Sequence, residues 1–152
     1  MAFASPTLPH PDPPLVRALT AGGLYFLIAL TAGFALGAVR ELVIAPRVTS
    51  DLAIVLETPV MAVVAWFAAG FSIRRLAVPD DLGSRLPMGL LALTLLLGAE
   101  ELLTQALRGG SLLDHWSMYG YLATAANLAG LIWFTLAPLR IKARPERVRP
   151  HA

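Results

Sequence analysis

Cysteine is absent from this chain of 152 residues, and charged residues make up only 14% of it. Without cysteine the protein has no disulfide, no thiolate nucleophile and no thiolate-bound metal or iron–sulfur cluster. Histidine is scarce as well, since His10 and His151 lie near the chain ends and only His115 lies between them. Paired histidine ligation of a haem inside a helical bundle is therefore not expected. We expect neither a metal nor a cofactor.

Hydrophobic residues account for 57% of the sequence, and the mean hydropathy is +0.67. Both values lie outside the usual range of globular proteins and indicate a membrane protein. Four apolar segments are each close to the roughly 20 residues that cross a hydrocarbon core about 30 Å thick. We predict an all-α fold, an integral membrane four-helix bundle, with spans at about 18–39, 52–73, 86–107 and 116–139.

The predicted domain organisation has three parts. Residues 1–14 are rich in proline and are predicted to be disordered. Residues 15–140 form the transmembrane domain, and residues 141–152 form a basic tail. We interpret the first span as a signal anchor rather than a cleaved signal peptide, because the proline-rich stretch precedes it and its apolar run exceeds the usual length.

Both ends of a chain with four spans lie on the same side of the membrane. The two ends and the loop between spans two and three hold nine of the 12 basic residues, and the other two loops hold three. The positive-inside rule therefore places both ends in the cytoplasm. Arginine is strongly preferred, with Lys142 the only lysine, a bias that often accompanies a GC-rich bacterial genome. We predict a multi-pass protein of the bacterial inner (plasma) membrane.

The expected partners follow from this placement. The basic tail predicts binding to anionic lipid, at about 1 kcal/mol per basic residue near the surface, and nucleic acid is not expected. Besides the lipid bilayer, a membrane protein partner or a homo-oligomer is expected. The stretch "GFALG", residues 33–37, has a spacing that lets helices approach closely, and internal packing is favoured over dimerisation. Trp116, Tyr119 and Tyr121 are predicted at the outer headgroup level.

Ionisable residues inside the predicted spans carry the strongest functional signal, because a charge at the centre of a membrane helix costs about 2.5 to 3.5 kcal/mol. At a rise of 1.5 Å per residue, Glu57 and Glu101 both lie roughly 9 to 11 Å below the outer boundary. They are predicted to belong to one polar cluster in the outer half of the bundle. The candidate residues are Arg40, Glu41, Arg47, Glu57, Glu100, Glu101 and Asn127.

Adjacent helix positions point about 100° apart, so Glu100 and Glu101 cannot both face the same direction. Glu101 shares its side with polar and small residues, whereas Glu100 shares its side mostly with leucines. We predict that Glu101 points inward and that Glu100 faces a helix edge, a partner protein, or lipid as a protonated acid. The polar stripe comprises Thr94, Gly98, Thr104, Gln105 and Arg108, and the leucine side comprises Leu96, Leu97, Leu103 and Leu107.

The stretch "GAVRELVIAPRVTSDLAIVLETPVM", residues 37–61, resembles small uncharacterised four-helix inner-membrane proteins of bacteria, which implies a fold and no function. The order Arg47, Glu57, Pro59 is similar to that of the membrane-associated eicosanoid and glutathione metabolism proteins, although their asparagine is missing here. The chain also resembles the small multidrug resistance transporters in its four helices. Their essential glutamate lies in helix one, whereas the first acid within a span here is Glu57 in helix two.

Three functions are compatible with the polar cluster. The first is a non-enzymatic accessory or scaffold subunit of a membrane assembly, in which Arg40, Glu57 and Glu101 hold the helices together as a structural clamp. The second is an autonomous transporter or a protein that binds a cation or small polar ligand through Glu57 and Glu101, with Arg47 tuning them. The third is a membrane enzyme that acts on lipid or a glutathione-type conjugate, with a carboxylate as general base.

Overall fold

The computed structural model describes residues 12–44 and 46–142, and within these ranges the chain contains helices and no strands. The all-α prediction is confirmed for this part of the chain. Most of the predicted segment 1–14 and of the predicted tail 141–152 lies outside the described residues. In chain order, the elements are α1 (Pro14–Val39), the π-helical turn η1 (Arg40–Ile44), α2 (Ser50–Arg75), α3 (Leu82–Arg108), α4 (Leu112–Ser117) and α5 (Tyr121–Arg140).

Local sequence signals explain where the long helices begin. Pro14 occupies the first turn of α1, where its missing N–H leaves no hydrogen bond unmade. Thr49 caps α2 by accepting a hydrogen bond from the Leu52 N–H at 3.4 Å. Asp81 caps α3 in the same way, accepting from the Ser84 N–H at 2.9 Å. Each cap lies a few residues before the predicted span, because the helices extend beyond their apolar segments.

The fourth long helix is shorter than predicted. The prediction began it at residue 116, but Trp116 lies in the separate helix α4 and α5 begins at Tyr121. Gly120 forms the N-cap of α5 without a side-chain cap of its own. Asp51 of α2 supplies the acceptor instead, and the Gly120 N–H donates to its two carboxylate oxygens at 3.2 and 3.1 Å. A carboxylate at this helix N-terminus also interacts favourably with the helix dipole.

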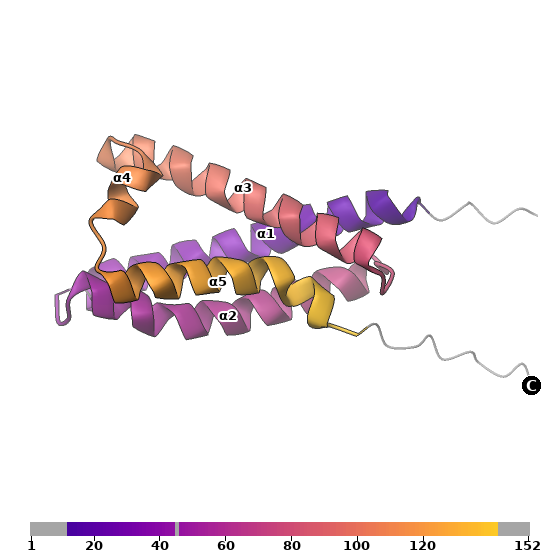
Figure 1. Cartoon of the computed structure of the whole chain (residues 1–152), viewed down its shortest axis with the longest axis horizontal. Coiled ribbons are helices and arrows are strands. Elements are labelled where there is room, and N and C mark those ends of the chain that lie inside the picture. The colour runs from indigo at the N-terminus through magenta and orange to yellow at the C-terminus, as the bar shows by residue number, and fades with distance from the viewer. Residues whose placement is uncertain (1–11, 45, 143–152) are drawn as a thin grey trace, which may run out of the picture.

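The four long helices form a bundle in which α1 and α5 each pack between α2 and α3 (Figure 1). On the α2–α5 side, the rings of Trp66 and Trp133 stack with centroids 5.8 Å apart, and Trp133 Nε1 donates to the carbonyl oxygen of Ala62 at 3.0 Å. Across the bundle, Tyr25 stacks on Phe134 at 4.3 Å and donates to its carbonyl oxygen at 2.9 Å. These contacts join α1 and α2 to α5 near the middle of the bundle.

The backbones approach most closely at the end where α3 begins. A Cβ atom added to Gly22 would lie 2.7 Å from the carbonyl oxygen of Met88, and one added to Gly89 would overlap the backbone of Thr135. Buried alanines complete this small-residue contact, among them Ala18 and Ala21. Farther along, Gly37 and Gly98 have no neighbouring atom within 4 Å of such a Cβ. In Figure 1, α3 diverges from the other helices toward α4.

Two arginines hold the loop between α2 and α3 at the closely packed end. Arg17 Nη1 donates to the carbonyl oxygen of Ala77 at 2.9 Å, and Arg85 Nε donates to that of Pro79 at 2.7 Å. Ala77 has a φ of 48°, which places this turn in the left-handed region. Arg85 is only 1% exposed, and its Nη2 lies 3.9 Å from an oxygen of Asp80. The loop is therefore tied to α1 through Arg17 and to α3 through Arg85.

All four long helices are long and apolar enough to cross a membrane. Many of their large apolar side chains are exposed, and some of these, including Phe67 and Leu102, lie outside the lining of the cavity described below. Outward-facing apolar residues are expected where lipid replaces water as the surroundings. The four helices fit a multi-pass membrane protein. By length and composition, the candidate spans are Pro14–Ile44, Ser50–Arg75, Leu82–Leu107 and Tyr121–Arg140.

Candidate functional site

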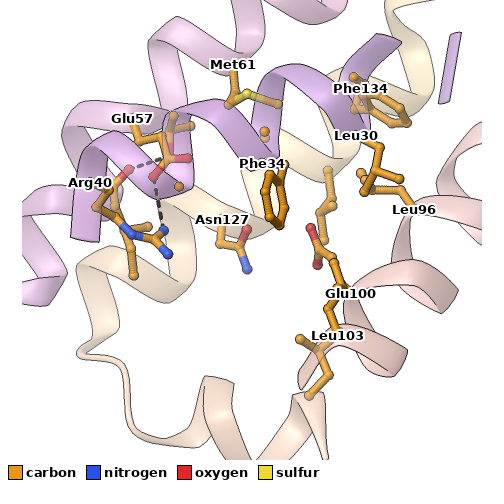
Figure 2. Close-up of a pocket in the computed structure, with 18 of the residues that line it drawn as sticks. Leu30, Phe34, Arg40, Glu57, Met61, Leu96, Glu100, Leu103, Asn127 and Phe134 are labelled. Atoms are coloured by element: carbon orange, nitrogen blue, oxygen red, sulfur yellow. Dashed lines mark hydrogen bonds and ion pairs between the residues drawn. The ribbon is translucent and has the colours of Figure 1, made fainter. Parts of the chain in front are cut away.

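A cavity of about 490 Å³ lies where α3 diverges from α1 and α5. All four long helices and α4 contribute to its wall. Its volume falls within the roughly 300 to 1,000 Å³ that is usual for small-molecule sites, and its wall is mostly apolar, as such sites are. Figure 2 shows that side chains from several helices converge on this space. The apolar lining includes Leu30, Phe34, Met61, Leu96, Leu103 and Phe134.

One wall of the cavity carries an ion pair between Arg40 and Glu57. Arg40 Nη1 lies 3.0 Å from Glu57 Oε2, and the side chains are 25% and 16% exposed (Figure 2). This contact joins the end of α1 to α2. Arg40 is also the first residue of the π-helical turn η1. Such turns are rare and occur frequently at functional sites.

The opposite wall carries Glu100, whose carboxylate points into the cavity in Figure 2. Among the described residues, it makes no hydrogen bond or ion pair. Asn127 of α5 also lines the cavity and lies between the ion pair and Glu100 in this view. The charged side chains of the lining are Arg40, Glu57 and Glu100. Because the first two neutralise each other, an ionised Glu100 gives the cavity a net charge of one negative unit.

Glu101 lies outside the cavity lining, so the prediction that it points inward was wrong. Its Oε1 accepts a hydrogen bond from Gln105 Nε2 at 2.6 Å, and its Oε2 accepts one from the Leu112 N–H at 2.7 Å. The leucine side of α3 faces inward instead, because the space that it borders is itself mainly apolar. A short helix after the α3 loop requires an acceptor for its first N–H groups, and this requirement was the missed signal.

The remaining predicted residues are placed differently. Arg47 is exposed outside the lining and donates to the carbonyl oxygen of Val43, so it does not join the cluster. The side chain of Glu41 lies outside the described part of the structure. The structure thus brings together Arg40, Glu57, Glu100 and Asn127, and it separates Arg47 and Glu101 from them.

The short helix α4 covers one end of the cavity with Leu112 and Trp116, and Tyr119 follows in the next turn. Sequence reasoning placed the two aromatic residues at the headgroup level and missed their position in the lining. Ser111 and Asp114 cap α4 reciprocally: the Ser111 hydroxyl donates to Asp114 Oδ2 at 2.8 Å, and the Asp114 N–H donates to the Ser111 hydroxyl at 3.1 Å. The hydrogen bond from the Ser111 hydroxyl, with one from its backbone N–H, lowers the pKa of Asp114.

Comparisons of this chain with protein-family models, with curated proteins and with solved structures find no match. The family resemblances drawn from residues 37–61 therefore stay predictions. In the part of the chain that the structure describes, no group of three or more histidine, aspartate or glutamate residues is arranged to hold a metal ion.

Proposed function

We propose that this protein is an integral membrane protein that binds a small organic ligand in the cavity between its four helices, as an autonomous binding protein or transporter. The observation that carries the proposal is a cavity of about 490 Å³ whose apolar wall contains a carboxylate without a hydrogen bond or ion pair among the described residues. Ligand sites typically combine an apolar wall with a few converging polar groups. An ionisable residue inside a membrane-spanning helix is itself a functional signal.

We place the protein in the bacterial inner membrane with both ends in the cytoplasm. The distribution of arginine and lysine supports this orientation. In this orientation the wide end of the bundle, with Glu57 and Glu100, lies in the outer half of the membrane. A reporter active only in the cytoplasm, fused after Ala152, is expected to be active. Activity of a reporter that works only in the periplasm at the same position would invert the placement of the cavity.

Two glycines offer a matched test of the cavity. Gly37 of α1 lines it, Gly98 of α3 does not, and neither has an atom within 4 Å of an added Cβ. Gly37→Leu is expected to occupy part of the cavity and weaken ligand binding at least about tenfold, because the ligand then meets a side chain in its place. Gly98→Leu places the same side chain outside the cavity and is expected to leave binding unchanged.

The measurement is a small-molecule screen by thermal unfolding of the protein in lipid nanodiscs, followed by calorimetric titration of each compound that stabilises it. Parent and Gly98→Leu proteins are expected to share a ligand that Gly37→Leu no longer binds. If every stabilising compound acted equally on both variants, the cavity would not be the binding site and the proposal would be wrong.

A second candidate function is an accessory or scaffold subunit, and the ion pair between Arg40 and Glu57 favours it. This contact holds α1 against α2 at 3.0 Å without any ligand. Gentle extraction of a tagged protein from its native membrane tests the candidate. A stoichiometric protein partner would support a subunit role, whereas a monomer or homo-oligomer that binds a small molecule would support the first proposal.

A further inference from the structure

The composition of the cavity wall indicates the charge of its ligand. Arg40 already contacts Glu57 at 3.0 Å, so the two charges are paired on the α1–α2 side. Glu100 on the α3 side lines the same cavity without such a contact among the described residues. A carboxylate that loses water without gaining a partner is strongly destabilised. A ligand that brings a positive charge to Glu100 would remove this penalty.

Aromatic residues of the wall favour the same ligand. Phe34, Trp116 and Tyr119 all line the cavity, and Figure 2 shows the side chains of Phe34 and Glu100 directed into it. Aromatic faces attract organic cations, an interaction that strengthens where water is excluded. An inorganic cation is less well suited, because the described part of the chain holds no group of three or more histidine, aspartate or glutamate residues arranged to bind a metal ion. The apolar lining that includes Leu96, Leu131 and Phe134 suits a hydrocarbon body instead.

Resting on the proposed function, we propose that the ligand is an organic cation: a quaternary or protonated amine attached to an apolar body. Its ammonium group lies between Glu100 and the aromatic side chains, and its apolar body lies along α1, α3 and α5. Glu100 is the counter-ion that selects charge, and the cavity wall selects size and shape. Glu101, one residue away, contacts Gln105 and the start of α4 and takes no part.

The test uses three probes of similar shape and different charge. Phenethyltrimethylammonium carries a permanent positive charge, (3,3-dimethylbutyl)benzene replaces its nitrogen with carbon and is neutral, and 3-phenylpropane-1-sulfonate is an anion. Each is titrated calorimetrically into the protein in lipid nanodiscs, and the heat from empty nanodiscs is subtracted. Glu100→Gln keeps the side-chain shape without the charge, and Glu101→Gln is the matched control on the neighbouring residue. Thermal unfolding of both variants verifies that they fold.

We expect saturable binding of the cation, weakened about tenfold or more by Glu100→Gln and less than about twofold by Glu101→Gln, because only the first variant removes the charge that meets the ligand. The neutral probe is expected to bind more weakly than the cation, with no response to Glu100→Gln. Gly37→Leu is expected to weaken binding of both probes, since both require the same space.

Other outcomes distinguish the two proposals. If the neutral probe bound as tightly as the cation and Gly37→Leu weakened both, the cavity would be a ligand site and the assignment of charge would be wrong. Tightest binding of the sulfonate would likewise overturn it and assign the selecting charge to Arg40. If no probe bound saturably, or if Gly37→Leu left all binding unchanged, both the organic-cation assignment and the proposed function would be contradicted.

Discussion

Glu100 and Glu101 show how two identical neighbouring side chains acquire different roles. Glu100 points into the cavity, whereas Glu101 accepts hydrogen bonds from Gln105 and the Leu112 N–H. Helix geometry predicts that they point about 100° apart. It does not decide which of them faces inward, and the usual preference for polar residues in a membrane-bundle interior gave the wrong answer. The interior here is an apolar cavity, so the leucine side of α3 lines it.

At the residue scale, the ion pair between Arg40 and Glu57 makes a quantitative prediction. Arg40→Met and Glu57→Gln are each expected to lower the free energy of unfolding by about 1 to 3 kcal/mol, because each removes the charged hydrogen bond that joins α1 to α2. The double variant is expected to lose less than the sum of the two, since the lost contact is then counted once. Thermal and denaturant unfolding in detergent measure this cycle. Additive losses would show that the contact does not couple the two side chains.

At the scale of elements, the positions of the long helices could be predicted from apolar length, and all four predicted spans fall largely within helices of the structure. The start of α5 could not be predicted from the sequence. Residues 112–117 form a helix of their own, and Asp51 caps α5 at Gly120 from a distant part of the chain. Neither the six residues of α4 nor a cap from α2 leaves a periodic signal in the sequence.

Gly89 makes the close approach of α3 and α5 testable. Gly89→Ala is expected to lower the free energy of unfolding by about 1 to 3 kcal/mol, because the new methyl group would overlap the backbone of Thr135. Gly98→Ala, in the same helix with open space at its Cβ, is expected to be neutral or to stabilise by up to about 1 kcal/mol through helix propensity. Equal stability of the two variants in thermal unfolding would argue against this packing.

The cap of α4 predicts a dependence on pH. The hydrogen bonds that the Asp114 carboxylate accepts from Ser111 hold the pKa of Asp114 below its ordinary value of 3.8. The ionised carboxylate therefore stabilises α4 above that value, and the contribution is lost as the pH falls through the lower pKa of the folded state. Ser111→Ala is expected to raise the pKa of Asp114 and to reduce the loss of α4 on acidification.

Carboxyl carbon chemical shifts, followed by NMR during an acid titration, measure this pKa. Ser117→Ala is the matched control, because its hydroxyl donates to the backbone carbonyl of Asp114 at 2.6 Å rather than to the carboxylate. An unchanged pKa in Ser111→Ala, or an equal change in both variants, would contradict the reciprocal cap.

At the scale of the whole molecule, the sequence predicts a polar cluster in one half of the bundle but not the cavity beside it. The cavity depends on where the helices touch and where they separate. Gly22 and Gly89 permit close packing at one end, whereas Gly37 and Gly98 meet no neighbour at the other. All four are glycines within apolar segments, and only their facing partners distinguish them. Arg85 is a similar case, since charge counting treats it as a loop residue and the structure buries it.

Two adjacent leucines of α3 allow a direct test of whether a ligand-accessible cavity lies inside the bundle. Leu103 lines the cavity, whereas Leu102 is exposed on the outside of the bundle, and the two differ by only about 1.5 Å in depth. The chain has no cysteine, so Leu103→Cys and Leu102→Cys each introduce a single thiol. The measurement uses a methanethiosulfonate reagent that dissolves in water and does not cross membranes. It is the rate at which this reagent modifies each thiol in sealed vesicles. We expect rapid modification of Leu103→Cys, slowed by phenethyltrimethylammonium, and little modification of Leu102→Cys in lipid. Equal rates, or faster modification of Leu102→Cys, would contradict the presence of such a cavity.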